Sequence, residues 1–72
     1  ISIDSDNAEL LFNRGLVHLA TRNFDMAISD FSEALTIDPA FKNSYEHRAH
    51  AYEQLGLEEK AASDREALHS NK

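Results

Sequence analysis

The chain has 72 residues, with 13 Asp or Glu against 7 Lys or Arg and no cysteine, and its formal net charge is −6 at pH 7. This length holds one small domain, and the lack of cysteine excludes a disulfide framework and a thiolate metal site. The negative charge disfavours nucleic acids and anionic membrane surfaces as partners, and no apolar stretch is long enough to span a bilayer. A cysteine-free chain fits a reducing compartment, so we expect a cytoplasmic location.

Two helices are predicted in the first half of the chain. The first covers residues 8–20 and is apolar on nearly all sides, which is typical of a helix packed between several neighbours. A turn follows, in which Asn23 is suited to a left-handed or capping conformation. The second helix covers residues 24–37, where apolar residues recur at helical spacing on one face. It ends at Asp38, because the residue before Pro39 is disfavoured in the helical region.

Two more helices are predicted in the second half. The third covers residues 41–55, and Gly56 stands where a glycine commonly follows a helix C-terminus. The fourth runs from residue 57 to about residue 70, on a thin apolar stripe that Arg65 interrupts. Because helices joined by such short turns pack as antiparallel neighbours, the expected fold class is all-α.

The sequence repeats itself at a shift of 34 residues. Identical residues recur at this shift, among them Arg14 with Arg48, Ala27 with Ala61, Ser29 with Ser63 and Asp30 with Asp64. The opening residues 1–5 also align with residues 35–39. We therefore expect residues 1–7 to be the end of a preceding repeat or a linker, residues 8–41 to be a first repeat, and residues 42–72 to be a second. Asp30 and Asp64 are placed on the polar sides of their helices, in a solvated or helix-pairing role.

A helix–turn–helix unit of this period resembles the tetratricopeptide repeat (TPR) family. The positions that carry the resemblance in the two first helices are Leu11, Arg14, Gly15 and His18, then Tyr45, Arg48, Ala49 and Tyr52. Those in the second helix of the first repeat are Ala27, Phe31, Ala34 and Pro39. The resemblance implies antiparallel helix–turn–helix repeats that stack into an alpha-alpha superhelix, or solenoid.

The second repeat departs from the family pattern after Ala61. The aromatic position holds Arg65, and Ala67 and Leu68 fall one residue earlier than the first repeat predicts. Either the last helix is polar and faces solvent, or the repeat degenerates there.

The resemblance also implies a function, since first helices of this family line a concave groove that binds other proteins. We therefore expect a protein–protein interaction scaffold that binds a peptide or helix of a partner protein. The groove residues that the resemblance implies are Glu9, Phe12, Asn13, Leu16, Leu19, Asn43, Glu46, His47, His50 and Glu53. Phe12 and Leu16 are the candidate anchors, unless they pack against a helix outside this sequence.

One subfamily binds acidic C-termini of chaperones through a clamp of lysine, arginine and asparagine. Asn13 matches the asparagine, but the positions of the lysine and the arginine hold Asn43 and His47. Neither side chain replaces the cation that holds a carboxylate, so chaperone tails are not the expected ligand.

Chemistry at a metal or catalytic site is not expected. His47 and His50 lie one helical turn apart, a spacing that suits a metal, but the other two histidines, His18 and His69, are far off in sequence and no cysteine joins them. A pH-dependent partner contact is the other use of these two residues. Neither a phosphate-binding glycine loop nor a nucleophile motif is present, so we expect no enzyme activity and no cofactor.

Two further roles stay open. The segment is structural or self-associating within a longer array, with Ile3, Leu10 and Leu11 exposed near one end. Alternatively, it is the regulatory arm of a larger enzyme whose catalytic part lies outside this sequence.

Overall fold

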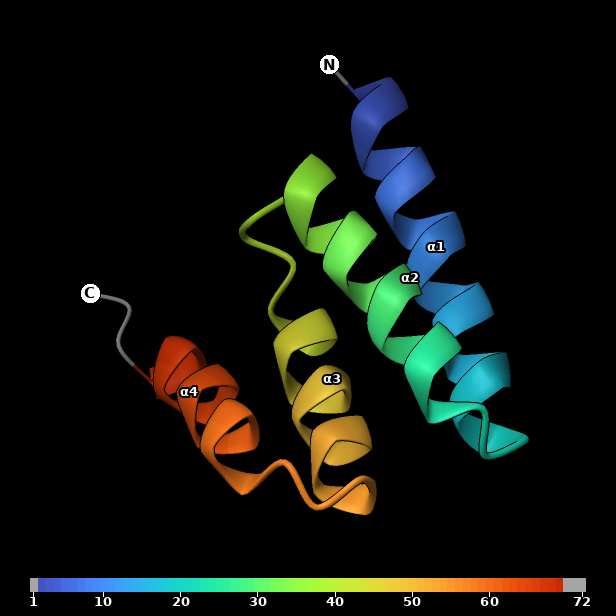
Figure 1. Cartoon of the computed structure of the whole chain (residues 1–72). Coiled ribbons are helices and arrows are strands. Elements are labelled where there is room, and N and C mark those ends of the chain that lie inside the picture. The colour runs from blue at the N-terminus through green and yellow to red at the C-terminus, as the bar shows by residue number, and fades with distance from the viewer. Residues whose placement is uncertain (1, 70–72) are drawn as a thin grey trace.

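A computed structural model describes the backbone of residues 2–69 and the side chains of residues 7–69. Its described part consists of the four helices α1 (Ser2–Ala20), α2 (Phe24–Ile37), α3 (Lys42–Gln54) and α4 (Glu58–His69). Consecutive helices run antiparallel and lie side by side, so that α2 stands between α1 and α3, and α4 packs on the far side of α3 (Figure 1). The all-α repeat architecture is confirmed. Within the described residues, no helix is both long and apolar enough to cross a membrane.

Where the structure describes them, the observed helix bounds lie within one residue of the predicted ones, except at the start of α1. The second helix was predicted to the residue, and α3 and α4 each begin one residue later than expected. In contrast, α1 continues through residues 2–7, so the helix start predicted at Ala8 is wrong. The alignment of residues 1–5 with residues 35–39 explains the difference. Pro39 drives Asp38 into an extended conformation, with φ −137° and ψ 90°, whereas residue 5 is a serine that imposes no such break.

The turns after α1 and α3 share one geometry. In each turn, a backbone N–H two residues beyond the helix cap donates a hydrogen bond to the carbonyl oxygen five residues earlier. After α1, Asn23 donates to His18 at 2.8 Å, and after α3, Leu57 donates to Tyr52 at 2.9 Å. This geometry requires a left-handed residue just after the cap. Gly56 provides it in the second turn with φ 80°, as predicted, but Arg22 adopts it in the first with φ 67°. Asn23 was predicted to take either the left-handed or the capping conformation, and the left-handed residue is instead its neighbour Arg22. Asn23 does precede α2 at the capping position, without a side-chain cap bond.

Replacing Arg22 by glycine should stabilise the fold. A side chain with a β-carbon pays about 1 kcal/mol for the left-handed conformation, which glycine adopts without strain. We expect Arg22→Gly to raise the free energy of unfolding in urea by about 1 kcal/mol. The matched control is Gly56→Ala at the equivalent position, which should lower it by a similar amount. Equal stability of Arg22→Gly and wild type would contradict this account.

The core is built mainly from small residues, which let the helices approach closely. The buried alanines among the described side chains are Ala8, Ala27, Ala34, Ala49, Ala51 and Ala61. Phe31 is the large side chain at the centre, fully buried on α2, and it lies directly over Gly15 of α1. A β-carbon built at residue 15 would stand 2.6 Å from the Phe31 ring, so glycine is required where this ring meets α1.

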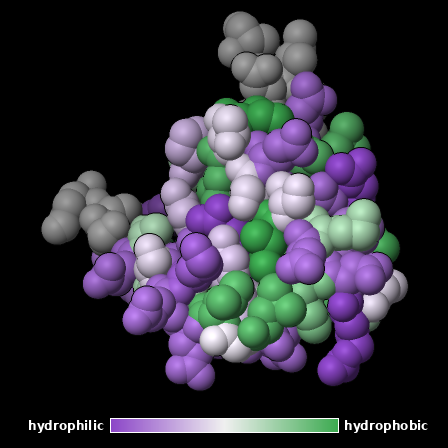
Figure 2. All heavy atoms as spheres, viewed as in Figure 1, coloured by the Kyte–Doolittle hydropathy of each residue, from purple (hydrophilic) through white to green (hydrophobic). Residues whose placement is uncertain are grey.

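The fourth helix is polar and faces solvent. Only Ala61 and Asp64 are buried on it, and Arg65, at the register of Phe31, is exposed. Of the two alternatives for the end of the second repeat, the structure therefore bears out the polar, solvent-facing helix. Figure 2 shows hydrophobic side chains along the centre of one face of the molecule, with hydrophilic side chains on both flanks.

Candidate functional site

The first helices of the two repeats, α1 and α3, meet through aromatic rings. The Phe12 ring on α1 stands edge-on to the His47 ring on α3, with centroids 5.3 Å apart. It also contacts Phe41, which immediately precedes α3, at 4.9 Å, and Phe31 of α2 at 5.7 Å. Since tilted and edge-to-face rings at these distances attract each other, this aromatic cluster fixes α3 against α1.

Nine of the ten predicted groove residues have exposed or half-exposed side chains. The six exposed ones are Glu9, Asn13, Asn43, Glu46, His50 and Glu53, and the three half-exposed ones are Leu16, Leu19 and His47. We refer to these nine residues of α1 and α3 as the α1–α3 surface. Three of them are acidic and none is a lysine or arginine. This surface can therefore accept basic groups and can offer apolar contact at Leu16 and Leu19.

The tenth residue, Phe12, is only 8% exposed and belongs to the hydrophobic core with Ala27 and Phe31. The expectation of an exposed anchor at Phe12 is therefore wrong. Its ring is covered by α2 and α3 within this chain. Leu16 packs against the same cluster but stays half exposed, so it is the apolar contact that a partner can reach.

The two neighbouring histidines occupy different environments. The Nδ1 atom of His47 lies 2.9 Å from the backbone oxygen of Asn43. Because a carbonyl oxygen only accepts, Nδ1 carries the proton and donates, and in the neutral ring Nε2 is left as an acceptor. His50 is exposed one turn further along. Among residues 7–69, no three His, Asp or Glu side chains gather closely enough to hold a metal ion.

Glu53 is already paired within the chain. Its carboxylate accepts a hydrogen bond from the guanidinium of Arg65 on α4, and this bond holds the pKa of Glu53 below its ordinary value. The same bond raises the pKa of Arg65. Arg65 thus crosses from α4 to the edge of the α1–α3 surface, where it neutralises one of the three acidic residues.

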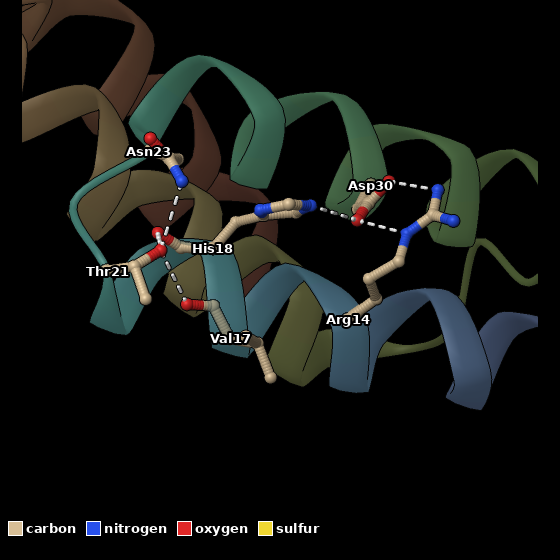
Figure 3. Close-up of polar contacts among 6 residues, drawn as sticks. All are labelled: Arg14, Val17, His18, Thr21, Asn23 and Asp30. Atoms are coloured by element: carbon tan, nitrogen blue, oxygen red, sulfur yellow. Dashed lines mark hydrogen bonds and ion pairs between the residues drawn. The ribbon is translucent and has the colours of Figure 1, made fainter.

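In each of the two helix pairs, an ion pair with a buried aspartate ties the first helix to the second. Arg14 binds Asp30 through Nε and Nη2, both at 2.9 Å, and His18 Nε2 lies 3.7 Å from the same carboxylate (Figure 3). Arg48 binds Asp64 in the same two-pronged way, at 2.9 and 2.6 Å. Both aspartates are 4% exposed, so their predicted polar-side position is wrong and their helix-pairing role is confirmed. In both repeats the arginine and the aspartate stand 16 residues apart in the sequence, and this recurrence could have predicted the two ion pairs.

Because Arg14 is paired with Asp30, it cannot act as the cation of a clamp that binds a ligand carboxylate. Its guanidinium points from α1 to α2, as Figure 3 shows, while the neighbouring Asn13 belongs to the α1–α3 surface. A ligand carboxylate on that surface would therefore meet Asn13 without the adjacent cation.

The Asp30 carboxylate should make stability depend on acid pH. Hydrogen bonds from Arg14 lower its pKa, and this effect outweighs the rise that burial causes. A carboxyl group whose pKa is lower in the folded state than in the unfolded state stabilises the folded state. This contribution is fully present at pH values above the unfolded-state pKa of about 4, and it is lost as the pH falls through the lower folded-state pKa. We expect urea denaturation between pH 7 and about pH 3 to show a shallower loss of stability for Asp30→Asn than for wild type. The control Asp25→Asn, at an exposed position, should follow wild type, and an equally steep loss in Asp30→Asn would contradict this account.

Comparisons with known proteins agree with this geometry. Residues 8–41 match the model of a family described as "Tetratricopeptide repeat". A stretch of 42 residues, 58% of this chain, is 43% identical to peptidyl-prolyl cis-trans isomerase FKBP4 of Mus musculus, and the match to FKBP4 of Rattus norvegicus and of Bos taurus is equally close. The aligned stretch spans 9% of the length of each of these relatives. No solved structure matches the chain.

Proposed function

Because residues 8–41 are a tetratricopeptide repeat, we propose that this chain is a protein–protein interaction module that binds a partner along the α1–α3 surface. The observation that carries the proposal is the contact of Phe12 with His47, which fixes α1 beside α3. Two rigidly joined helices present their exposed side chains at constant spacing, which suits recognition of a peptide or a helix.

The charges and apolar side chains of the α1–α3 surface restrict the kind of partner that it can bind. Glu9 and Glu46 are exposed carboxylates with no ion-pair partner among the described side chains, and the whole chain carries a net charge of −6. Leu16 and Leu19 offer half-exposed apolar contact beside them. We therefore propose a partner segment that carries Lys or Arg together with at least one apolar side chain. Acidic C-terminal tails do not fit this surface.

A peptide selection tests the proposal. A phage-displayed peptide library would be selected on the immobilised chain, and the enriched peptides measured against variants by fluorescence anisotropy. We expect basic, partly apolar peptides, whose affinity falls about tenfold or more in Glu9→Lys/Glu46→Lys, because two attractive charges become repulsive. The control Glu33→Lys/Glu66→Lys makes the same charge change at exposed positions outside this surface and should bind as wild type does.

The variant Leu16→Ala tests the apolar contact in the same experiment. It should weaken the selected peptides while the helical circular-dichroism signal is retained. Peptides that bind both Glu9→Lys/Glu46→Lys and Leu16→Ala as tightly as wild type would show that the partner site lies elsewhere on the chain.

Catalysis forms no part of the proposed role. The isomerase activity in the name of the relatives belongs to proteins of which the match covers 9%, so we assign it to those proteins and not to this chain. The cytoplasmic location and the absence of a nucleic-acid partner stay predictions from composition.

A further inference from the structure

Two positions that hold apolar residues in the first repeat hold an ion pair in the second. In the first repeat Leu19 of α1 packs against the core cluster that contains Phe31 of α2. The equivalent residues, 34 positions later, are Glu53 of α3 and Arg65 of α4. Their side chains form an ion pair, with Nη1 of Arg65 2.5 Å from Oε2 of Glu53. The link between first and second helix at these positions is therefore ionic in the second repeat.

This ion pair differs from the two Arg–Asp pairs described above because solvent reaches both of its members. The side chains of Asp30 and Asp64 are 6% and 5% exposed, so a ligand cannot take the place of their arginines. The side chains of Arg65 and Glu53 are 46% and 40% exposed. Since solvent screens an exposed ion pair, such a pair contributes little to stability and opens at little cost. The Glu53 carboxylate can therefore exchange Arg65 for another cation.

Arg65 lies where a basic side chain of a partner would bind. Glu53 belongs to the α1–α3 surface, and Arg65 reaches it from α4. The hydrogen bond with Glu53 raises the pKa of Arg65, and the charge of Glu46, a second carboxylate of this surface, adds to the rise. The guanidinium of Arg65 is therefore within electrostatic reach of two of the three acidic residues of the surface. It is also the kind of group that we propose for the partner.

We propose that Arg65 is an internal competitor of the partner, which holds Glu53 while the α1–α3 surface is free and releases it when a Lys or Arg of the partner binds there. This inference rests on the proposed function, because only a basic group would replace Arg65. The exchange substitutes one ion pair on Glu53 for another and returns the Arg65 guanidinium to water. Its effect is a lower affinity for every basic segment that binds Glu53, so that weakly basic segments are excluded first.

The probe is a fluorescently labelled hexapeptide that alternates lysine and leucine, added to the full chain at physiological ionic strength and followed by fluorescence anisotropy. We expect Arg65→Ala to bind it about twofold to fivefold more tightly than wild type, the range that one exposed ion pair accounts for. The matched control Lys60→Ala removes the same charge from another exposed position of α4 and should bind as wild type does, because salt screens distant charges. Arg65→Ala/Glu53→Gln should lose the gain, because the second change removes the carboxylate that the first one frees.

Nuclear magnetic resonance tests the exchange itself in the wild-type chain. As the probe is added, the guanidinium Nη resonances of Arg65 should move toward those of a freely hydrated arginine. The corresponding resonances of Arg48 are the internal control. Because Arg48 is bonded to the buried Asp64 carboxylate, they should stay in place.

Equal affinity of Arg65→Ala and wild type would overturn the competition. So would a gain that Lys60→Ala matches or that Glu53→Gln does not remove, or Arg65 resonances that the bound probe leaves in place. If Glu9→Lys/Glu46→Lys still weakens binding in any of these cases, the proposed function stands and the competitor alone fails. If the probe binds neither wild type nor Arg65→Ala, or ignores Glu9→Lys/Glu46→Lys, the proposed function fails and the competition with it. The substituted side chains are exposed, so the variants should stay folded, which circular dichroism checks.

Discussion

Phe31→Ala should remove most of the stability of the fold at room temperature. Phe31 is fully buried at the meeting point of α1, α2 and α3, over Gly15 and against the Phe12 ring. Removing a ring from such a site costs about 3–5 kcal/mol, because the lost contacts are joined by a cavity that α-helices cannot close by small shifts. A domain of this size has a total stability of only about 5 kcal/mol. We expect the helical circular-dichroism signal at 25 °C to fall, because up to about half of the molecules would be unfolded, and the thermal transition to move to a much lower temperature.

The second repeat provides the control for this experiment. Arg65 occupies the register of Phe31 on α4 but is exposed, so Arg65→Ala removes a side chain of similar length without opening a cavity. Its thermal transition should stay close to that of wild type. If Phe31→Ala melted within a few degrees of Arg65→Ala, the aromatic cluster would not be the centre of the fold.

Asp64→Asn should have the next largest effect, a loss of about 3 kcal/mol in the free energy of unfolding. The change removes the charge that partners Arg48, whose side chain is only 19% exposed and lies between the rings of Tyr45 and Tyr52. An arginine keeps its charge at neutral pH, so the loss of Asp64 leaves the Arg48 guanidinium in a partly desolvated position without its partner. Chemical denaturation at pH 7 measures the loss.

Two variants test the cause of that loss. Glu66→Gln makes the same charge change at an exposed position of α4 and should cost little. The double variant Arg48→Met/Asp64→Leu replaces the pair by apolar side chains and should be more stable than Asp64→Asn alone, because no buried charge is left without a partner. A double variant as unstable as Asp64→Asn would mean that packing, and not the charge, is responsible.

Local signals in the sequence predicted most of the fold. Pro39 ends α2, Gly56 follows α3, and apolar spacing defines the helices between these points. Where the prediction was wrong, the observed conformation is set by tertiary structure, or the sequence carries no local signal that would end the helix. Arg22 adopts the left-handed conformation because the turn into α2 demands it at that residue, although its own preference is against it. At the other end, no residue in positions 2–7 forces a break, so α1 simply continues.

The candidate site was harder to predict, since helical spacing gives the direction of a side chain but not what lies beyond it. Phe12 and Leu16 are one turn apart on the same side of α1, yet Phe12 is covered by Phe41 and His47 while Leu16 remains half exposed. That difference depends on where α3 crosses α1. Likewise, Asp30 looked solvated because aspartate is usually exposed, and only the approach of Arg14 from another helix explains its burial.

The contact of Phe31 with Gly15 restricts the order in which this chain can accept mutations. In the first repeat the two positions hold glycine and phenylalanine, and in the second they hold Ala49 and Arg65. An alanine at residue 15 would collide with the ring, so the methyl group can be added without strain only once the aromatic side chain has gone. A path from the first arrangement to the second therefore has a favoured direction, aromatic loss first and glycine replacement afterwards.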